Sequence, residues 1–259
     1  MRRLAVLALA ATLAGVAQAA TYVDLPGGRF ESVLPQGAVP TVSTPVDIAP
    51  FAMRSEPVTV REFAAFVQAH PEWQRGQAPS LLADHRYLLQ WEDPRQPGAS
   101  VPAAAPVTEV SWFAARAFCE EEGARLPTWL EWEYAASADA TRADARRDPA
   151  WSRRILSWYE KPGGSALAAV GGDANLWGVR DLHGLVWEWV DDYNALFIAG
   201  DSRTQGDPDT LKFCGAGAIN IIDRDSYAVL MRIALLSSLN AADTTSTLGF
   251  RCVRPTKAQ

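Results

Sequence analysis

The feature that most constrains the fold is a high tryptophan content in a chain with few long periodic segments. Ten of the 259 residues are tryptophan, and 48% of the residues are apolar. Each buried tryptophan removes roughly 150–250 Å² of surface from water, so a few of them can replace long regular elements as the source of stability. We therefore predict a single compact α+β domain with short elements and much ordered loop.

Helical signals are confined to two stretches in the first half of the chain. In residues 57–67, apolar residues recur at helical spacing, at Val60, Phe63, Phe66 and Val67. In residues 106–136, Ser111 is placed to cap one helix that ends before Gly123, and Thr128 and Glu131 have the spacing of a capping box for the next. Residues 20–50 predict short strands and turns. After residue 137 the periodicity fades, and we expect only short strand-like pieces between loops.

The N-terminus has the pattern of an export signal. Arg2 and Arg3 precede a short apolar run over residues 4–16, and residues 17–19 read Ala-Gln-Ala, a small-x-small cleavage site. We predict a signal peptide over residues 1–19 and a periplasmic or secreted protein; an uncleaved anchor is the alternative. No later run reaches membrane length, so no membrane span is expected after signal removal. The net charge of −6 argues against a nucleic-acid partner.

The cysteines and histidines limit the metal chemistry that the chain can support. Cys119, Cys214 and Cys252 would lie in an oxidising compartment, where three cysteines mean one pair and a leftover thiol, or no pair. No CxxC or HxxxH spacing is present. The three histidines are scattered, which argues against a three-histidine metal site.

Four segments together resemble the formylglycine-generating enzyme family, also called the sulfatase-modifying-factor family. They are PVTVREFAAFV (57–67), PVTEVSWFAARAFCEEEGARLPTWLEWEYAA (106–136), NLWGVRDLHGLVWEWVDDY (175–193) and LGFRCVR (248–254). The resemblance covers residues 25–255. It implies one compact, loop-rich α+β domain, a variant of the C-type lectin fold.

The resemblance implies a structural calcium ion in the segment DLHGLVWEW. Carried over by position, its ligands are the side chains of Asp181 and Glu188 and the carbonyl oxygens of Gly184 and Val186. Calcium favours such a mixture of hard oxygens. The alternative is that both carboxylates are solvated surface charges, the commoner case for acidic residues. Leu185 stands where the family usually has asparagine.

The resemblance also implies a disulfide between Cys119 and Cys252. The alternative is two buried free thiols. A second disulfide of the family is absent, because its two positions fall on Ala136 and Ile233.

The redox chemistry of the family is missing from this chain. The enzymes hold copper between two cysteines, and those positions fall here on Asp223 and Ala228. Copper(I) requires soft thiolates, so we expect no copper(I) dithiolate site. Cys214 is the leftover thiol, either reactive or a half-buried structural cysteine. The candidates for any catalytic role are Cys214, Asp223, Tyr227 and Arg232.

Three functions fit these observations. The first is an exported accessory or maturation protein without formylglycine-generating activity. It would bind a partner protein or peptide such as a periplasmic metalloenzyme; residues 213–252 resemble the NirV-type branch associated with copper nitrite reductase in denitrifying bacteria. The second is an oxidoreductase that acts on a protein or small molecule through a different centre. The third is a lectin-like binding module.

Overall fold

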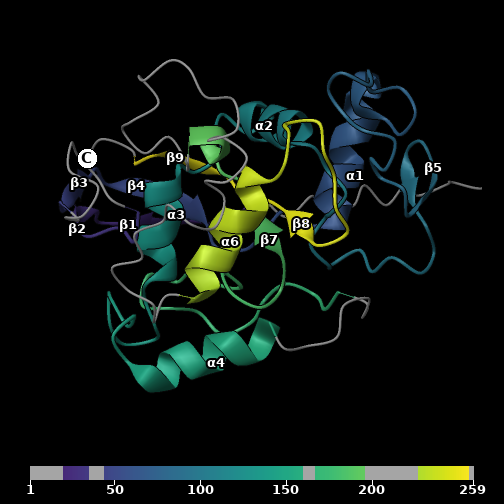
Figure 1. The fold of residues 1–259 in the computed structure, drawn as a ribbon. Coiled ribbons are helices and arrows are strands. Elements are labelled where there is room, and N and C mark those ends of the chain that lie inside the picture. The colour runs from purple at the N-terminus through teal and green to yellow at the C-terminus, as the bar shows by residue number, and fades with distance from the viewer. Residues whose placement is uncertain (1–19, 35–43, 160–166, 196–226, 257–259) are drawn as a thin grey trace, which may run out of the picture.

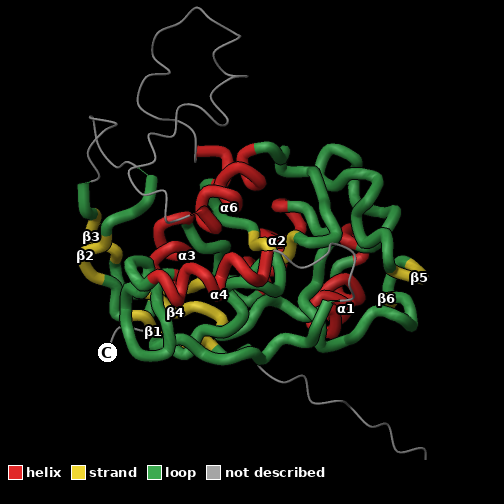
Figure 2. The backbone as a smooth tube through the Cα atoms, turned by 60° about the horizontal axis from the view of Figure 1, so that its bottom comes forward, coloured by secondary structure: helices red, strands yellow, loops and turns green. Residues whose placement is uncertain are grey.

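The chain consists of short helices and strands joined by long loops (Figures 1 and 2). The computed structural model describes residues 20–34, 44–159, 167–195 and 227–256. The predicted signal peptide and the candidates Cys214 and Asp223 lie outside these ranges. The strands are β1 (Tyr22–Leu25), β2 (Gly28–Phe30), β3 (Val46–Ile48), β4 (Phe51–Arg54), β5 (Trp91–Asp93), β6 (Gln96–Pro97), β7 (Trp187–Glu188), β8 (Leu248–Gly249) and β9 (Val253–Pro255). The helices are α1 (Val60–Ala69), η1 (Pro71–Trp73), α2 (Trp112–Glu121), α3 (Trp129–Ala136), α4 (Pro149–Tyr159), η2 (Tyr193–Ala195) and α6 (Tyr227–Ser237).

Two small sheets bring distant parts of the chain together. In the antiparallel sheet β1-β4-β9, Met53 pairs with both Val23 and Val253, so the first and last described strands lie on either side of β4. A second, parallel pair joins β7 to β8, with Trp187 opposite Leu248 and Glu188 opposite Gly249. The pairing of β7 with β8 places the WEW segment beside the LGFRC segment.

The three helices predicted in the first half are confirmed. Helix α1 buries Val60, Phe63, Phe66 and Val67, as their spacing predicts. Ser111 caps α2, and Thr128 and Glu131 form the predicted capping box of α3. Asp192 adds a second cap to α3, because its Oδ1 accepts the backbone N–H of Trp129 at 2.7 Å. Local capping bonds therefore mark where α2 and α3 begin, and a tertiary contact from Asp192 adds to the cap of α3.

The expectation of only strand-like pieces after residue 137 is wrong, because α4 and α6 are helices of eleven residues each. Helix α4 buries Trp151 and Ile155 at a helical spacing of four residues, a short signal in an otherwise charged segment. Helix α6 carries apolar residues on its exposed side as well, for example Met231, which is 41% exposed. A helix that is apolar all round shows no 3.6-residue period, so the sequence pattern does not identify it.

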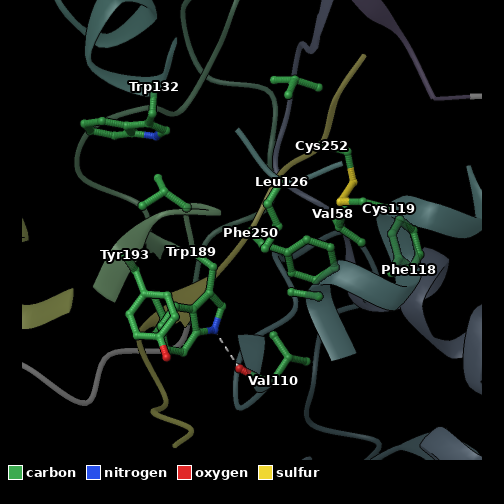
Figure 3. Close-up of a cluster of buried hydrophobic side chains, with 14 of the residues drawn as sticks. Val58, Val110, Phe118, Cys119, Leu126, Trp132, Trp189, Tyr193, Phe250 and Cys252 are labelled. Carbon is green, nitrogen blue, oxygen red and sulfur yellow. Dashed lines mark hydrogen bonds between the residues drawn. A yellow bond between two sulfur atoms is a disulfide. The ribbon is translucent and has the colours of Figure 1, made fainter. Parts of the chain in front are cut away.

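Large aromatic side chains form the centre of the core, as the tryptophan content predicts (Figure 3). Trp129, Trp132 and Trp189 are almost completely buried. Trp189 donates its indole N–H to the carbonyl of Val110 at 3.0 Å, which satisfies the polar atom of a side chain that is otherwise apolar. Helix α4 packs through a separate small cluster of Ala145, Trp151, Ile155 and Trp158. In Figure 1 this helix lies along the lower edge of the molecule.

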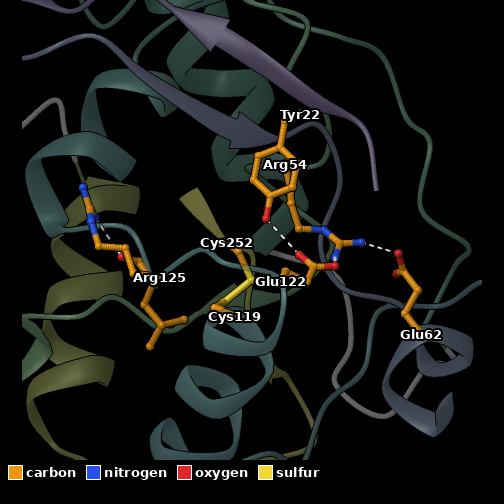
Figure 4. The surroundings of a disulfide bond; sticks show 8 residues. Tyr22, Arg54, Glu62, Cys119, Glu122, Arg125 and Cys252 are labelled. Atoms are coloured by element: carbon orange, nitrogen blue, oxygen red, sulfur yellow. Dashed lines mark hydrogen bonds and ion pairs between the residues drawn. A yellow bond between two sulfur atoms is a disulfide. The ribbon is translucent and has the colours of Figure 1, made fainter. Parts of the chain in front are cut away.

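The predicted disulfide is confirmed (Figure 4). Cys119 of α2 and Cys252, which precedes β9, are bonded with a Cα–Cα distance of 5.5 Å, and 133 positions separate them in sequence. Beside the disulfide, buried Arg54 pairs with Glu62 and, at 2.6 Å, with Glu122. The bond therefore fixes α2 to the C-terminal strand of the main sheet.

Among the helices of the described ranges, none is long and apolar enough to cross a membrane.

Candidate functional site

The segment HGLVWEW is held in place by main-chain bonds to the end of the chain. The N–H of Trp187 donates to the carbonyl of Thr247 at 2.8 Å, and that of Trp189 donates to the carbonyl of Gly249 at 3.0 Å. This pairing turns Trp189 and Glu188 into the interior, where both side chains are fully buried.

A buried ion pair joins Glu188 to Arg251, and neither side chain is exposed to solvent. Arg251 donates from Nε to Oε2 at 2.9 Å and from Nη2 to Oε1 at 2.8 Å, a two-point contact that matches the planar guanidinium to the carboxylate. It also donates to the carbonyl oxygens of Arg54 at 3.2 Å and Arg180 at 2.9 Å. Arg251 therefore links β4, Arg180 and β7.

Arg232 is also buried, with 2% of its surface exposed. It donates to the main-chain carbonyl of Glu188, and its guanidinium carbon lies 3.5 Å from the centre of the Trp132 ring. The same Trp132 donates its indole N–H to Oε2 of Glu188 at 2.8 Å. Arg232, a candidate for a catalytic role, therefore contacts two buried residues, Glu188 and Trp132.

Asp181 adopts a left-handed backbone conformation, with φ of 58°. Its Oδ2 accepts the N–H of Gly171 at 2.7 Å, and its Oδ1 accepts that of Gly172 at 3.1 Å. A Cβ at position 172 would lie 2.4 Å from Oδ1, so a larger residue there would displace the carboxylate of Asp181. Asp181 therefore ties residues 171–172 to the segment that precedes β7.

His183 lies among three tryptophans, with ring centres 5.8 Å from Trp132, 5.6 Å from Trp151 and 6.1 Å from Trp158. Its Nε2 lies 2.9 Å from the carbonyl oxygen of Ala136, which can only accept, so Nε2 carries the proton. Nδ1 is buried without a hydrogen-bond partner among the described residues. Burial lowers the pKa of this imidazole to about 4, so it is neutral at pH 7.

The four predicted calcium ligands have the donor chemistry for an ion, but much of it is already used. An ionised carboxylate offers about four lone-pair positions, and N–H donors take three of those of Glu188. Arg251 also balances the charge of Glu188. Of the two predicted carboxylate ligands, Asp181 is therefore the one whose charge would remain for a calcium ion. In the described ranges, no group of three or more His, Cys, Asp or Glu side chains is placed to hold a metal.

These residues therefore fit at most a weak calcium site. Calcium binds more weakly when fewer charged ligands surround it. Dissociation constants of about 10⁻⁴–10⁻³ M are typical of extracellular calcium-binding modules. Bound calcium would add structural support to residues 181–188. Calcium stays a prediction, and a rise in melting temperature on adding calcium, but not magnesium, is the measurement that tests it.

The structure describes the catalytic candidates only in part. Tyr227 is the first residue of α6, and Ala228, which the resemblance implies is a copper-ligand position of the family, follows it. Arg232 is one turn further along the same helix. Ala136 and Ile233, which the resemblance places at the positions of the family's second disulfide, are both buried.

Sequence reasoning missed a cavity of about 460 Å³ beneath α4. Trp151, Ile155 and Trp158 line it from α4, and His183 and Asp181 line it from the segment that precedes β7. The helix that forms one wall was not predicted, so the cavity was not expected either. The spacing of Trp151, Ile155 and Trp158 was the available signal.

The comparisons with known proteins place the chain in a family. The model of the sulfatase-modifying factor enzyme 1-like domain matches residues 10–256. Inactive C-alpha-formylglycine-generating enzyme 2 of Bos taurus is 27% identical over 92% of this chain and 89% of that protein. Hercynine oxygenase of Mycobacterium tuberculosis is 32% identical over 56% of this chain, and the match spans 38% of the oxygenase.

Among solved structures, PvdO from Pseudomonas aeruginosa aligns with a TM-score of 0.50 and 18% identity, over 91% of this chain and 94% of PvdO. At this identity the likeness concerns the fold alone, and it agrees with the single α+β domain expected from the sequence. The chain belongs to the sulfatase-modifying factor enzyme 1-like family, the family of the formylglycine-generating enzymes.

Proposed function

We propose that this chain is an exported accessory protein that assists the maturation of a partner metalloenzyme and does not generate formylglycine. One observation carries the proposal. The chain has three cysteines, and Cys119 and Cys252 are bonded to each other, so Cys214 alone remains. A copper(I) site built on two thiolates needs a second free cysteine, which the chain does not contain.

Two further observations support this proposal. The bovine relative, aligned over most of both chains, is itself named an inactive formylglycine-generating enzyme. The chain matches the family over residues 10–256 and contains the buried Glu188–Arg251 pair and the disulfide. A stable scaffold without its redox centre is suited to binding a polypeptide.

The partner that we propose is a periplasmic copper enzyme such as nitrite reductase. This part rests on the export pattern of residues 1–19 and on the likeness of residues 213–252 to the NirV-type branch. Calcium would serve only to support the fold.

An oxidoreductase with a different centre is the second candidate. The relative named hercynine oxygenase favours it, because a member of this family carries an oxygenase name. Cys214, Asp223, Tyr227 and Arg232 remain the residues to test for such an activity.

Maturation of a copper nitrite reductase in a host with and without this chain tests the accessory role. We expect the purified reductase to contain at least twofold less copper when the chain is deleted, and to regain it when the full chain is supplied. The Cys214→Ser variant should restore copper equally, because no thiol pair is involved. Equal copper content with and without the chain would reject the accessory role for this partner.

A further inference from the structure

We propose that the cavity beneath α4 binds an organic cation, an ammonium or guanidinium group carried on a short apolar body. This inference goes beyond the proposed function and does not depend on it. The cavity lies between α4, the end of α3 and residues 168–185, all within the described part of the chain. Its volume of about 460 Å³ is that of a pocket for a small ligand, for which 300–1,000 Å³ is typical.

Aromatic and apolar side chains supply the wall that would contact the body of the ligand. Trp151 and Ile155 are buried, and Trp158 is partly buried, all on the face of α4 toward the cavity. Of the aromatic side chains, tryptophan attracts a cation over its ring face most strongly, and the attraction grows as the pair is removed from water. Trp158 is also fixed in position, because it packs directly on Gly184 and stacks on His183.

The charges of the lining favour a cation. Asp139, Asp173 and Asp181 contribute carboxylates, whereas Arg154 is the one arginine or lysine among the described lining residues. Asp139 is paired with Arg142 and Asp181 accepts two backbone N–H groups, so exposed Asp173 is the carboxylate most free to meet a ligand. A negative lining attracts cations and repels anions of the same shape.

His183 adds an independent observation. Its Nδ1 is a hydrogen-bond acceptor with no partner among the described residues, in a side chain that lines the cavity. A buried acceptor without a donor is costly and rare. The N–H groups of an ammonium or guanidinium ligand are donors of the kind that this acceptor lacks.

Calorimetric titration of the full chain with three probes of one shape tests the proposal. We expect 2-phenylethylamine, a cation, to bind at least tenfold more tightly than 3-phenylpropionate, an anion, and 2-phenylethanol, which is neutral. Trp158→Ala and Asp173→Asn should each weaken binding of the amine. We expect the dissociation constant to rise about tenfold in Trp158→Ala, because the cation–π interaction with this ring is lost. Trp73→Ala is the matched control, because Trp73 is a partly buried tryptophan outside the cavity.

Two further arms complete the experiment. Nα-acetyl-lysine-N-methylamide represents a lysine side chain of a polypeptide. If this probe binds more tightly than 2-phenylethylamine, the natural ligand is a side chain of a partner protein. If 2-phenylethylamine binds more tightly, the natural ligand is a small metabolite. Calcium is titrated separately, because Asp181 and Gly184 line the same cavity. The proposal is overturned if the anion binds as well as the amine, if no amine saturates by about 10 mM, or if only calcium binds.

Discussion

Replacing Arg251 with leucine is expected to destabilise the protein by about 3–5 kcal/mol, because it leaves the carboxylate of Glu188 buried without its counter-charge. Both side chains are fully buried, and Arg251 also donates to the carbonyls of Arg54 and Arg180, which would lose their partner. For a domain of this size the loss corresponds to a fall in melting temperature of about 10 °C. Thermal or urea unfolding followed by circular dichroism measures it.

The matched control is Arg116→Leu, which removes an arginine whose partner Glu120 is also largely exposed. A surface pair of this kind contributes about 0–1 kcal/mol, so the control should unfold close to the wild type. The Glu188→Gln variant combined with Arg251→Leu gives a double-mutant cycle, in which the pair should show a coupling free energy well above 1 kcal/mol. A loss below 1 kcal/mol for Arg251→Leu would show that the ion pair does not hold the WEW segment.

Replacing both cysteines of the disulfide with alanine is expected to cost about 5 kcal/mol. The bond closes a loop of 133 residues, and in the chain-entropy model the stabilisation grows with the length of the closed loop. Cys119 and Cys252 are both fully buried, so the alanine variant also loses some packing. Urea unfolding of the two proteins gives the difference in free energy of unfolding.

Thiol counting provides the control for this prediction. Denatured wild-type protein should show one reactive thiol, that of Cys214, and three after reduction. The double-alanine variant should show one thiol under both conditions. Three thiols in unreduced wild type, or a variant as stable as the wild type, would contradict the account of the disulfide.

Elements with strong local chemistry could be predicted from the sequence. Ser111, Thr128 and Glu131 specify the starts of α2 and α3 by hydrogen bonds within a few residues, and the structure shows those bonds. The Cys119–Cys252 pair required the family resemblance, because spacing alone does not assign partners among three cysteines.

Features that depend on tertiary contacts could not be predicted. Helix α6 is apolar on its exposed side as well as its buried side, so its sequence has no helical period. The pairing of Glu188 with Arg251 joins residues 63 positions apart and follows from the parallel pairing of β7 with β8. The cavity beneath α4 likewise exists only once α4 is packed against residues 168–185.

The absence of a thiolate pair that could hold copper(I), on which the proposed function depends, is tested by copper(I) binding. The measurement is competition with a chromogenic copper(I) chelator, followed by incubation with a sulfatase-type cysteine peptide and oxygen. We predict that the wild-type chain retains no copper and leaves the peptide mass unchanged, whereas Asp223→Cys combined with Ala228→Cys gains tight copper binding. One copper ion held tightly by the wild-type chain, together with converted peptide, would contradict the account.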